Sequence, residues 1–272
     1  MAARQVEVNG ARLSYRVAGS GDPVICVQGV GVAGSGWQPQ VAALATRYST
    51  ITFDNRGIGE STLGSGALSI GLMAQDVLAI MAAEGIERAH LVGHSMGGLI
   101  ALAVATEHPQ RVRSLSLLCT FADGREPTRP SARMVWLGMR SRIGTREMRR
   151  NAMLDMVMAP EYLQSTDRRA LARRLADLFG HDLADHPPIE MQQLRAMGAF
   201  TVVPRLAALA NIPTLVVSGA YDPIAPPSSG RRIAAGIPGA TFVEFEDASH
   251  ALTIQCDERI NSLLLKHLTL EG

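Results

Sequence analysis

Apolar residues occur along this chain either in short continuous runs or at helical spacing, and the order of these two patterns indicates how the chain is organised. Short runs such as 24–28 and 89–93 are almost continuously apolar, which indicates strands buried on both faces. The stretch 69–84 has a helical spacing of apolar residues instead. The two kinds of stretch alternate up to residue 120 and again from residue 202, which predicts an α/β fold with a parallel sheet between helices.

The pattern predicts eight strands, at 5–7, 13–17, 24–28, 49–54, 89–93, 112–120, 213–219 and 241–246. The first two flank Asn9-Gly10, a favoured hairpin turn. Helices are predicted at 40–47, 69–84, 96–108, 202–209, 228–235 and 251–268. Ser69 suits the N-cap of the second helix, and Gly85 suits its end.

Residues 124–200 interrupt this alternation. They are helical in pattern, rich in arginine and methionine, and contain no strand-like run. The alternation then resumes, so the stretch has the place of an insertion in a continuing sheet. We therefore expect a core domain formed by 1–123 and 201–272, with 124–200 as a separate helical unit.

Composition narrows the class of protein. A chain of 272 residues with 47% hydrophobic residues fits one large α/β domain with an insertion. The net charge of +1 gives no electrostatic reason to expect nucleic acid or acidic membranes as partners. The cysteines (Cys26, Cys119 and Cys256) are odd in number and widely spaced, which favours buried free thiols. With no signal peptide or membrane helix in the pattern, a cytoplasmic location is expected.

The stretch Gly93-His94-Ser95-Met96-Gly97 lies between a predicted strand and a predicted helix of small residues. This G-x-S-x-G pattern is typical of a nucleophile elbow, a strained turn that exposes the serine hydroxyl. Glycine on either side permits the close backbone approach that the turn needs. The positive end of the following helix would lie beneath the serine. Ser95 is therefore the candidate nucleophile.

A serine nucleophile needs a base, and the base needs a carboxylate that orients it. Reactive side chains of open α/β sheets collect at the carboxyl ends of strands. Asp222 follows the strand 213–219, and His250 follows the strand 241–246. We expect His250 to accept the proton of Ser95 and pass it to the leaving group, while Asp222 orients the imidazole and stabilises its charged form.

Four motifs in this order resemble the α/β-hydrolase fold superfamily over nearly the whole chain: FDNRGIGES (53–61), GHSMG (93–97), SGAYDPIAP (218–226) and DASHAL (247–252). The resemblance implies a mostly parallel eight-stranded sheet flanked by helices, with a helical cap at 124–200 inserted after the sixth strand. It also implies a reaction without cofactor or metal. The oxyanion hole would use the backbone N–H groups of Met96 and Val30.

Other residues compete for or modify these roles. Asp123 also follows a predicted strand, and some members of the superfamily carry the acid at that point, so it is a rival to Asp222. Asp247 is too close in sequence to His250 to orient it well, but it could tune the imidazole. His94, inside the elbow, is expected to support the site rather than to react.

The loop before Val30 departs from the family pattern. Family members often have His-Gly where this chain has Gln28-Gly29. Glutamine can donate and accept similar hydrogen bonds, so we expect a shifted loop rather than a loss of catalysis.

The segment 29–34 also matches the G-x-G-x-x-G pattern of dinucleotide-binding proteins, and Asp54 follows at the expected distance. Two features oppose nicotinamide binding. Gly36 and Pro39 fall where the phosphate-binding helix should continue, and Asp54 belongs to the 53–61 motif.

The expected cap is rich in adaptable side chains that either roof an apolar pocket or seal the cap to the core: Met134, Trp136, Leu137, Met139, Met148, Met153, Met156, Met158, Phe179, Met191, Met197 and Phe200. Its paired arginines at 149–150, 168–169 and 173–174 are interspersed with acids, which favours a solvated face over an anion site.

The leading hypothesis is a cofactor-independent serine hydrolase acting on a small or medium, largely apolar carboxylic ester or lactone. A second hypothesis keeps the same triad for carbon–carbon bond hydrolysis or perhydrolysis. A third is a ligand receptor of the same fold. The spacing of motifs leaves the substrate and the oligomeric state open.

Overall fold

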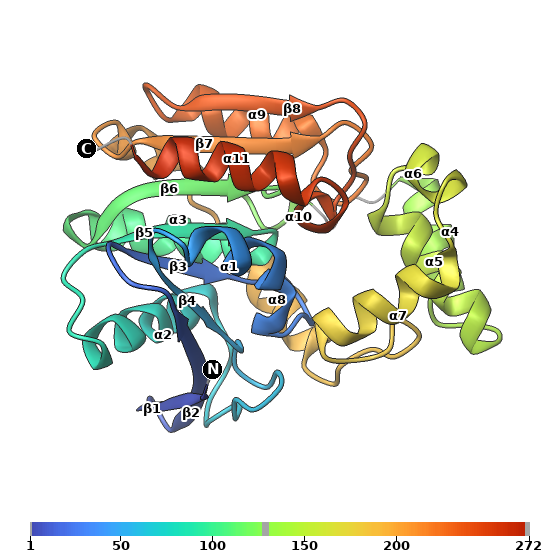
Figure 1. Cartoon of the computed structure of the whole chain (residues 1–272), viewed down its shortest axis with the longest axis horizontal. Helices are drawn as coiled ribbons and strands as arrows, with labels where there is room; N and C mark the ends of the chain where they lie inside the picture. Colours follow the sequence, from blue (N-terminus) through green and yellow to red (C-terminus); the bar gives the residue numbers. More distant parts are fainter. Residues whose placement is uncertain (1, 127–130, 270–272) are drawn as a thin grey trace.

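The structure is a computed structural model that describes residues 2–126 and 131–269. One eight-stranded sheet has the order β1-β2-β4-β3-β5-β6-β7-β8 (Figure 1). Only the β1–β2 and β2–β4 pairs are antiparallel, which confirms the mostly parallel sheet that the sequence predicts. The strands are β1 (Arg4–Val8), β2 (Ala11–Ala18), β3 (Pro23–Val27), β4 (Ser49–Phe53), β5 (Ala89–His94), β6 (Val112–Leu118), β7 (Thr214–Gly219) and β8 (Thr241–Phe245).

Helices cover both faces of the sheet. On one face lie α2 (Ile70–Ala83), α3 (Met96–Glu107) and α9 (Pro227–Gly236), and on the other lie α1 (Gln38–Leu44) and α11 (Asp257–Leu268). Successive residues of β3 alternate between these layers: Ile25 packs in one core cluster and Cys26 in the other. Burial on both faces therefore explains why the strands read as continuous apolar runs.

Local signals predict some element ends well and others poorly. The Ser69 hydroxyl caps α2 by accepting the N–H of Leu72. The single helix predicted at 251–268 is wrong, because α10 (Leu252–Gln255) and α11 are separated by Cys256, whose backbone is not helical. Within the described residues, short 3-10 helices lie at Gly34–Trp37, Pro109–Arg111 and Val203–Leu209.

The insertion between β6 and β7 consists of helices beyond the carboxyl ends of the strands (Figure 1). They are α4 (Ala132–Arg140), α5 (Arg146–Val157), α6 (Pro160–Gln164), α7 (Arg168–Phe179) and α8 (Glu190–Gly198). An antiparallel bridge between Asp123 and Thr201 joins the two ends of the segment. The expected domain boundaries also include residues 1, 127–130 and 270–272, which lie outside the described residues.

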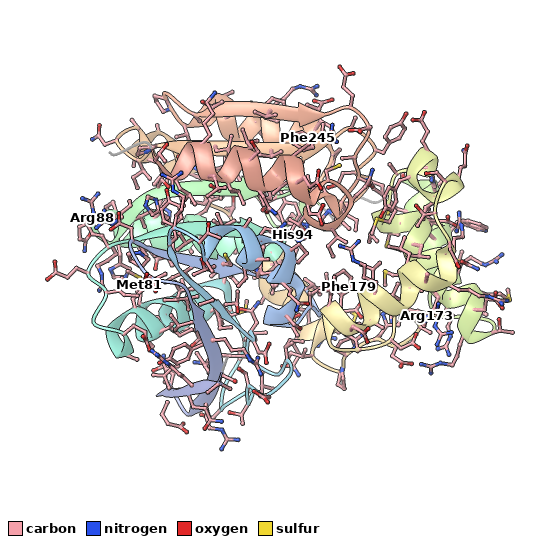
Figure 2. All side chains as sticks on the ribbon, in the orientation of Figure 1. Met81, Arg88, His94, Arg173, Phe179 and Phe245 are labelled. Atoms are coloured by element: carbon pink, nitrogen blue, oxygen red, sulfur yellow. The ribbon has the colours of Figure 1, made fainter. Side chains whose placement is uncertain are left out.

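The side chains of the insertion have mixed environments. Met158 and Met197 are buried, whereas the side chains that are well exposed include Trp136, Met139, Met148 and Met191. In Figure 2, Phe179 lies at the end of α7 nearer the sheet and Arg173 lies farther from the sheet along the same helix. Exposed arginines pair with carboxylates, as in Arg168–Asp155 and Arg169–Glu147, so these pairs form a solvated charged face. Among the described residues, no helix is both long and apolar enough to cross a bilayer.

The N-terminus of α3 packs against the sheet with no space for side chains. A Cβ atom on Gly97 would lie 2.0 Å from the carbonyl oxygen of Val27, and one on Gly93 would lie 2.4 Å from the carbonyl oxygen of Gly97. Real Cβ atoms do not approach backbone oxygens this closely. The two flanking glycines of the elbow are therefore required by contact distances.

Replacing Gly97 by alanine should destabilise the fold, because the new methyl group would force α3 away from β3. We expect a loss of about 1–3 kcal/mol in the free energy of unfolding, the usual cost of overpacking. The matched control is Gly138→Ala in α4, where a Cβ meets nothing within 4 Å and stability should rise by about 0.5–1 kcal/mol. Urea denaturation of both variants measures the difference, and equal stability would contradict the contact distances.

Candidate active site

Ser95 lies between the end of β5 and the start of α3 in a conformation that serine rarely adopts. Its backbone angles are φ 54° and ψ −120°, and a positive φ is uncommon for any residue other than glycine. Contacts with β6 and the residues after it hold this backbone. The N–H of Ser95 donates to the carbonyl of Leu118 at 3.0 Å, and its carbonyl accepts the Thr120 hydroxyl at 2.7 Å. Ser95 thus has the strained turn that the elbow pattern predicts.

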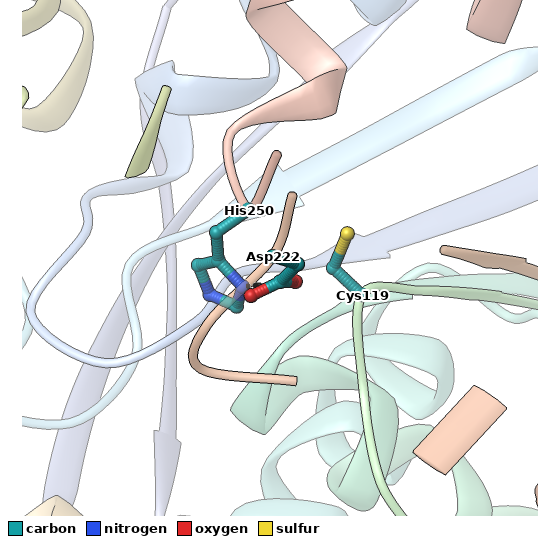
Figure 3. Close-up of side chains that lie close together, drawn as sticks. All are labelled: Cys119, Asp222 and His250. Carbon is teal, nitrogen blue, oxygen red and sulfur yellow. Dashed lines mark hydrogen bonds and ion pairs between the residues drawn. The ribbon is translucent and has the colours of Figure 1, made fainter. Parts of the chain in front are cut away.

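Asp222 and His250 meet at the ends of β7 and β8. Nδ1 of His250 lies 2.8 Å from Oδ2 of Asp222, whose side chain is completely buried (Figure 3). The other oxygen, Oδ1, accepts the N–H groups of Ile224 and Ala225 at 2.8 and 2.9 Å. An ionised carboxylate accepts but does not donate, so Nδ1 of His250 carries a proton. In the neutral imidazole, Nε2 then has a free lone pair.

His94 connects the two parts of this site. Its Nε2 donates to the backbone carbonyl of His250 at 2.8 Å, and the two imidazole rings have centroids 4.8 Å apart. Burial, together with the neighbouring His250, lowers the pKa of His94 to about 3. His94 is therefore neutral and suited to holding the His250 backbone. Within the described residues, the hydroxyl of Ser95 makes no hydrogen bond with the imidazole of His250.

The other two acids have different partners. The carboxylate of Asp123 accepts from the guanidinium and the backbone N–H of Arg125 at the base of the insertion. Asp247 pairs with Arg259 at 2.6 Å, and that hydrogen bond lowers the pKa of the Asp247 carboxyl. Of the three acids, it is Asp222 that accepts the hydrogen bond from Nδ1 of His250.

The loop after β3 lies against the serine. A Cβ on Gly29 would be 3.1 Å from the Cβ of Ser95. Gln28 is buried and accepts the Gly29 N–H through Oε1 at 3.2 Å, while its backbone carbonyl accepts the Asn55 amide at 3.0 Å. Gln28 therefore supports this loop with its own side chain, next to Val30. On the opposite side, the N–H of Met96 is among the first of α3, where no intrahelical acceptor exists.

Cys119 is a member of this site that the sequence reasoning missed. It lies immediately after β6 and has φ 44°. Its Sγ, a carboxylate oxygen of Asp222 and a ring nitrogen of His250 lie within 4.8 Å of one another (Figure 3). Burial and the nearby Asp222 raise the pKa of the Cys119 thiol well above its usual value. The sequence reasoning placed Cys119 inside the strand predicted at 112–120, whereas β6 ends at Leu118, so the rule that reactive residues follow strand ends passed over it.

These three side chains are also of the types that bind zinc. Both oxygens of Asp222 are already used as acceptors by Ile224, Ala225 and His250. A metal ion bound there would compete with the hydrogen bond between Asp222 and His250.

Asp54, which matches the dinucleotide pattern, has a structural use. Its Oδ1 accepts the N–H of Gly34 at 2.7 Å and its Oδ2 accepts the N–H of Glu60 at 3.0 Å. The carboxylate thereby joins the loop after β3 to the loop after β4. The glycine-rich stretch leads into a short 3-10 helix, Gly34–Trp37, and not directly into the α-helix that a phosphate-binding turn precedes.

Comparisons with known proteins agree with this architecture. A family model described as "alpha/beta hydrolase fold" matches residues 22–255. A relative from Caulobacter segnis, named a candidate carbamate hydrolase (RutD), is 32% identical over 96% of this chain and 95% of its own length.

Two solved structures are similar over 98% of this chain. The enol-lactonase from Burkholderia xenovorans LB400 is 28% identical, with a TM-score of 0.82 and all of its own chain covered. The thermophilic esterase from Thermogutta terrifontis is 25% identical, with a TM-score of 0.80 and 98% of its own chain covered.

Buried imidazoles predict a dependence of stability on pH. Burial lowers the pKa of His90 to about 4 and, with His250 nearby, that of His94 to about 3. In the unfolded chain both take up protons below about pH 6.5. Between pH 6.5 and pH 4 the unfolded state therefore binds more protons than the folded state. As the pH falls through this range, the free energy of unfolding decreases, by about 2 kcal/mol per imidazole at pH 5.0.

Urea denaturation at pH 7.5 and 5.0 checks this expectation. The midpoint should be lower at pH 5.0, and an equal or higher midpoint would show that these imidazoles protonate in the fold.

Proposed function

Because this chain belongs to the α/β-hydrolase fold family, we propose that it is a serine hydrolase that cleaves a small or medium, largely apolar carboxylic ester or lactone through an acyl-enzyme. The observation that carries the proposal is the 2.8 Å hydrogen bond between Nδ1 of His250 and the fully buried Asp222. It leaves Nε2 of a neutral imidazole free to accept a proton, at a site that also contains the strained turn of Ser95.

The proposed reaction has two halves. Nε2 of His250 accepts the hydroxyl proton of Ser95 as Oγ attacks the substrate carbonyl, and the imidazolium then protonates the leaving alcohol. A water molecule enters, gives a proton to His250 and attacks the acyl carbon. The bond from that carbon to Oγ of Ser95 then breaks, the imidazolium returns the proton to Oγ, and the carboxylic acid leaves. Asp222 keeps Nδ1 protonated and stabilises the imidazolium throughout. The hydrogen bond between Ser95 and His250 is expected to form when substrate binds, since catalytic hydrogen bonds are often long in empty sites.

The negative oxygen of each tetrahedral intermediate needs donors. We assign this role to the backbone N–H groups of Met96 and Val30. Met96 supports the assignment because it begins α3, whose positive end favours a developing negative charge. Val30 supports it because its loop lies against Ser95, where Gly29 and the serine have almost no space between them.

Similarity to the Burkholderia enol-lactonase and the Thermogutta esterase over nearly the whole chain supports an ester or a lactone as the substrate. A second candidate substrate class is a carbamate, because relatives named for carbamate hydrolysis match this chain almost end to end, at up to 32% identity. Both classes present a carbonyl carbon with a heteroatom leaving group, so the same three side chains serve either.

Substitution of the three residues tests the mechanism. Ser95→Ala should abolish hydrolysis of a short p-nitrophenyl ester and covalent labelling by a fluorophosphonate, located by mass spectrometry. Asp222→Asn should lower kcat by about 10⁴-fold, because the imidazole loses its orienting acceptor. Asp123→Asn is the matched control and should leave kcat near wild type. Retained turnover in Ser95→Ala would exclude the proposed nucleophile, and a large loss in Asp123→Asn alone would reassign the acid.

A substrate panel decides between the two classes. Equal concentrations of a short p-nitrophenyl ester, a γ-lactone and an N-alkyl carbamate would be compared by kcat/KM. We expect the ester and the lactone to exceed the carbamate, whose nitrogen lone pair makes its carbonyl less electrophilic. A kcat/KM higher for the carbamate would favour the second class.

A further inference from the structure

The loop after β3 is held by the insertion as well as by the core. Gly31 donates its N–H to Oε1 of Gln193 in α8 at 2.8 Å, and its carbonyl lies 3.1 Å from Nε2 of His181, whose Nδ1 lies 3.0 Å from the carbonyl of Asp182. Two residues further on, the N–H of Ala33 donates to the carbonyl of Phe179 at 3.1 Å. Both backbone polar groups of Gly31 are therefore fixed by side chains from the insertion.

From this geometry we propose that Gln193 and His181 are positioning residues for catalysis, because they hold the loop that carries the Val30 N–H. The inference rests on the proposed function, in which that N–H stabilises the oxyanion. The peptide plane that follows Val30 contains the Gly31 N–H, so fixing this N–H limits the rotation of Val30. The plane that precedes Val30 contains the Val30 N–H itself and begins at Gly29, whose own N–H is held by Gln28 at 3.2 Å.

The conformation of Gly31 explains why two side chains are needed. Its φ is 74°, a region that glycine enters freely, so the backbone has little intrinsic preference for this turn. A Cβ there would also meet Pro187 of the insertion at 3.6 Å, in ordinary contact distance. The turn is therefore set by its partners and not by steric exclusion. Loss of either hydrogen bond should let the loop sample other conformations.

Gln193 is well fixed for this task. It is completely buried, and Ala196 and Met197 on the same helix pack into the main core. Its Nε2 is buried without a hydrogen-bond partner in the described structure. A buried donor without an acceptor is unfavourable, because it has lost its hydrogen bonds to water. Replacing Gln193 with methionine removes this group together with the bond to Gly31, so the two effects on stability should largely cancel.

The test compares Gln193→Met with Gln192→Met, an exposed glutamine one position earlier in α8. Loss of an oxyanion donor lowers kcat by about 10²–10³-fold, and a misplaced donor should lower it by about 10-fold or more. We expect this loss in Gln193→Met with KM changed less than about threefold, since an interaction made only in the transition state affects kcat. Gln192→Met should behave as wild type.

A second pair of variants tests the same proposal without depending on whether Gln193→Met folds. His181→Phe removes the donor to Gly31 and should lower kcat in the same way. His181→Gln retains an N–H donor and should recover most of the rate. If Gln193→Met fails to fold, this pair decides the question by itself.

Hydrogen exchange of the Gly31 amide separates the possible outcomes. The exchange rate should increase in Gln193→Met and stay unchanged in Gln192→Met, independently of any effect on kcat. Faster exchange with wild-type kcat would overturn the positioning role while leaving the proposed function intact. Unchanged exchange would overturn the contact itself. Undiminished turnover in Ser95→Ala would overturn the proposed function, and this inference with it.

Discussion

The absence of space between the first turn of α3 and the sheet is the constraint on which the rest of the site depends. Gly97 can approach the carbonyl of Val27 only because it has no side chain. That approach keeps Ser95 at a positive φ, while Leu118 and Thr120 fix its two backbone polar groups. A strained residue of this kind costs about 1–3 kcal/mol. The nearly complete burial of α3 offsets the strain, since each buried large apolar side chain contributes about 1.5–3 kcal/mol.

The insertion contacts both sides of this fixed centre. On one side, its residues Phe179, His181 and Gln193 hold the loop after β3. On the other, the N–H of Ala251, next to His250, donates to the carbonyl of Val157 at the end of α5 at 2.8 Å. The insertion therefore holds the backbone next to His250 and the loop that carries Val30. In the proposed function, changes in the insertion should alter the rate.

The sequence predicted those features that depend on residues close together in the chain. The apolar runs predicted the strands because both faces of the sheet are covered, and the order of residues after the strands was enough to single out Asp222 and His250, which the fold brings together. Other features depend on contacts between distant segments. The break at Cys256 and the docking of Gln193 on Gly31 have no signal in the chain near them. Cys119 was missed for another reason, because the strand predicted at 112–120 extends two residues past Leu118, where β6 ends.

The burial of every cysteine has a consequence for experiments on this protein. The thiolate is the reactive form of cysteine. Burial raises the pKa of Cys26 to about 12, and it also raises the pKa of Cys119 and Cys256. The native cysteines of the folded chain should therefore react slowly with thiol-directed dyes. A single cysteine introduced at the exposed position of Val135 in α4 would carry the fluorescent label almost alone and would report how the insertion moves while the enzyme turns over.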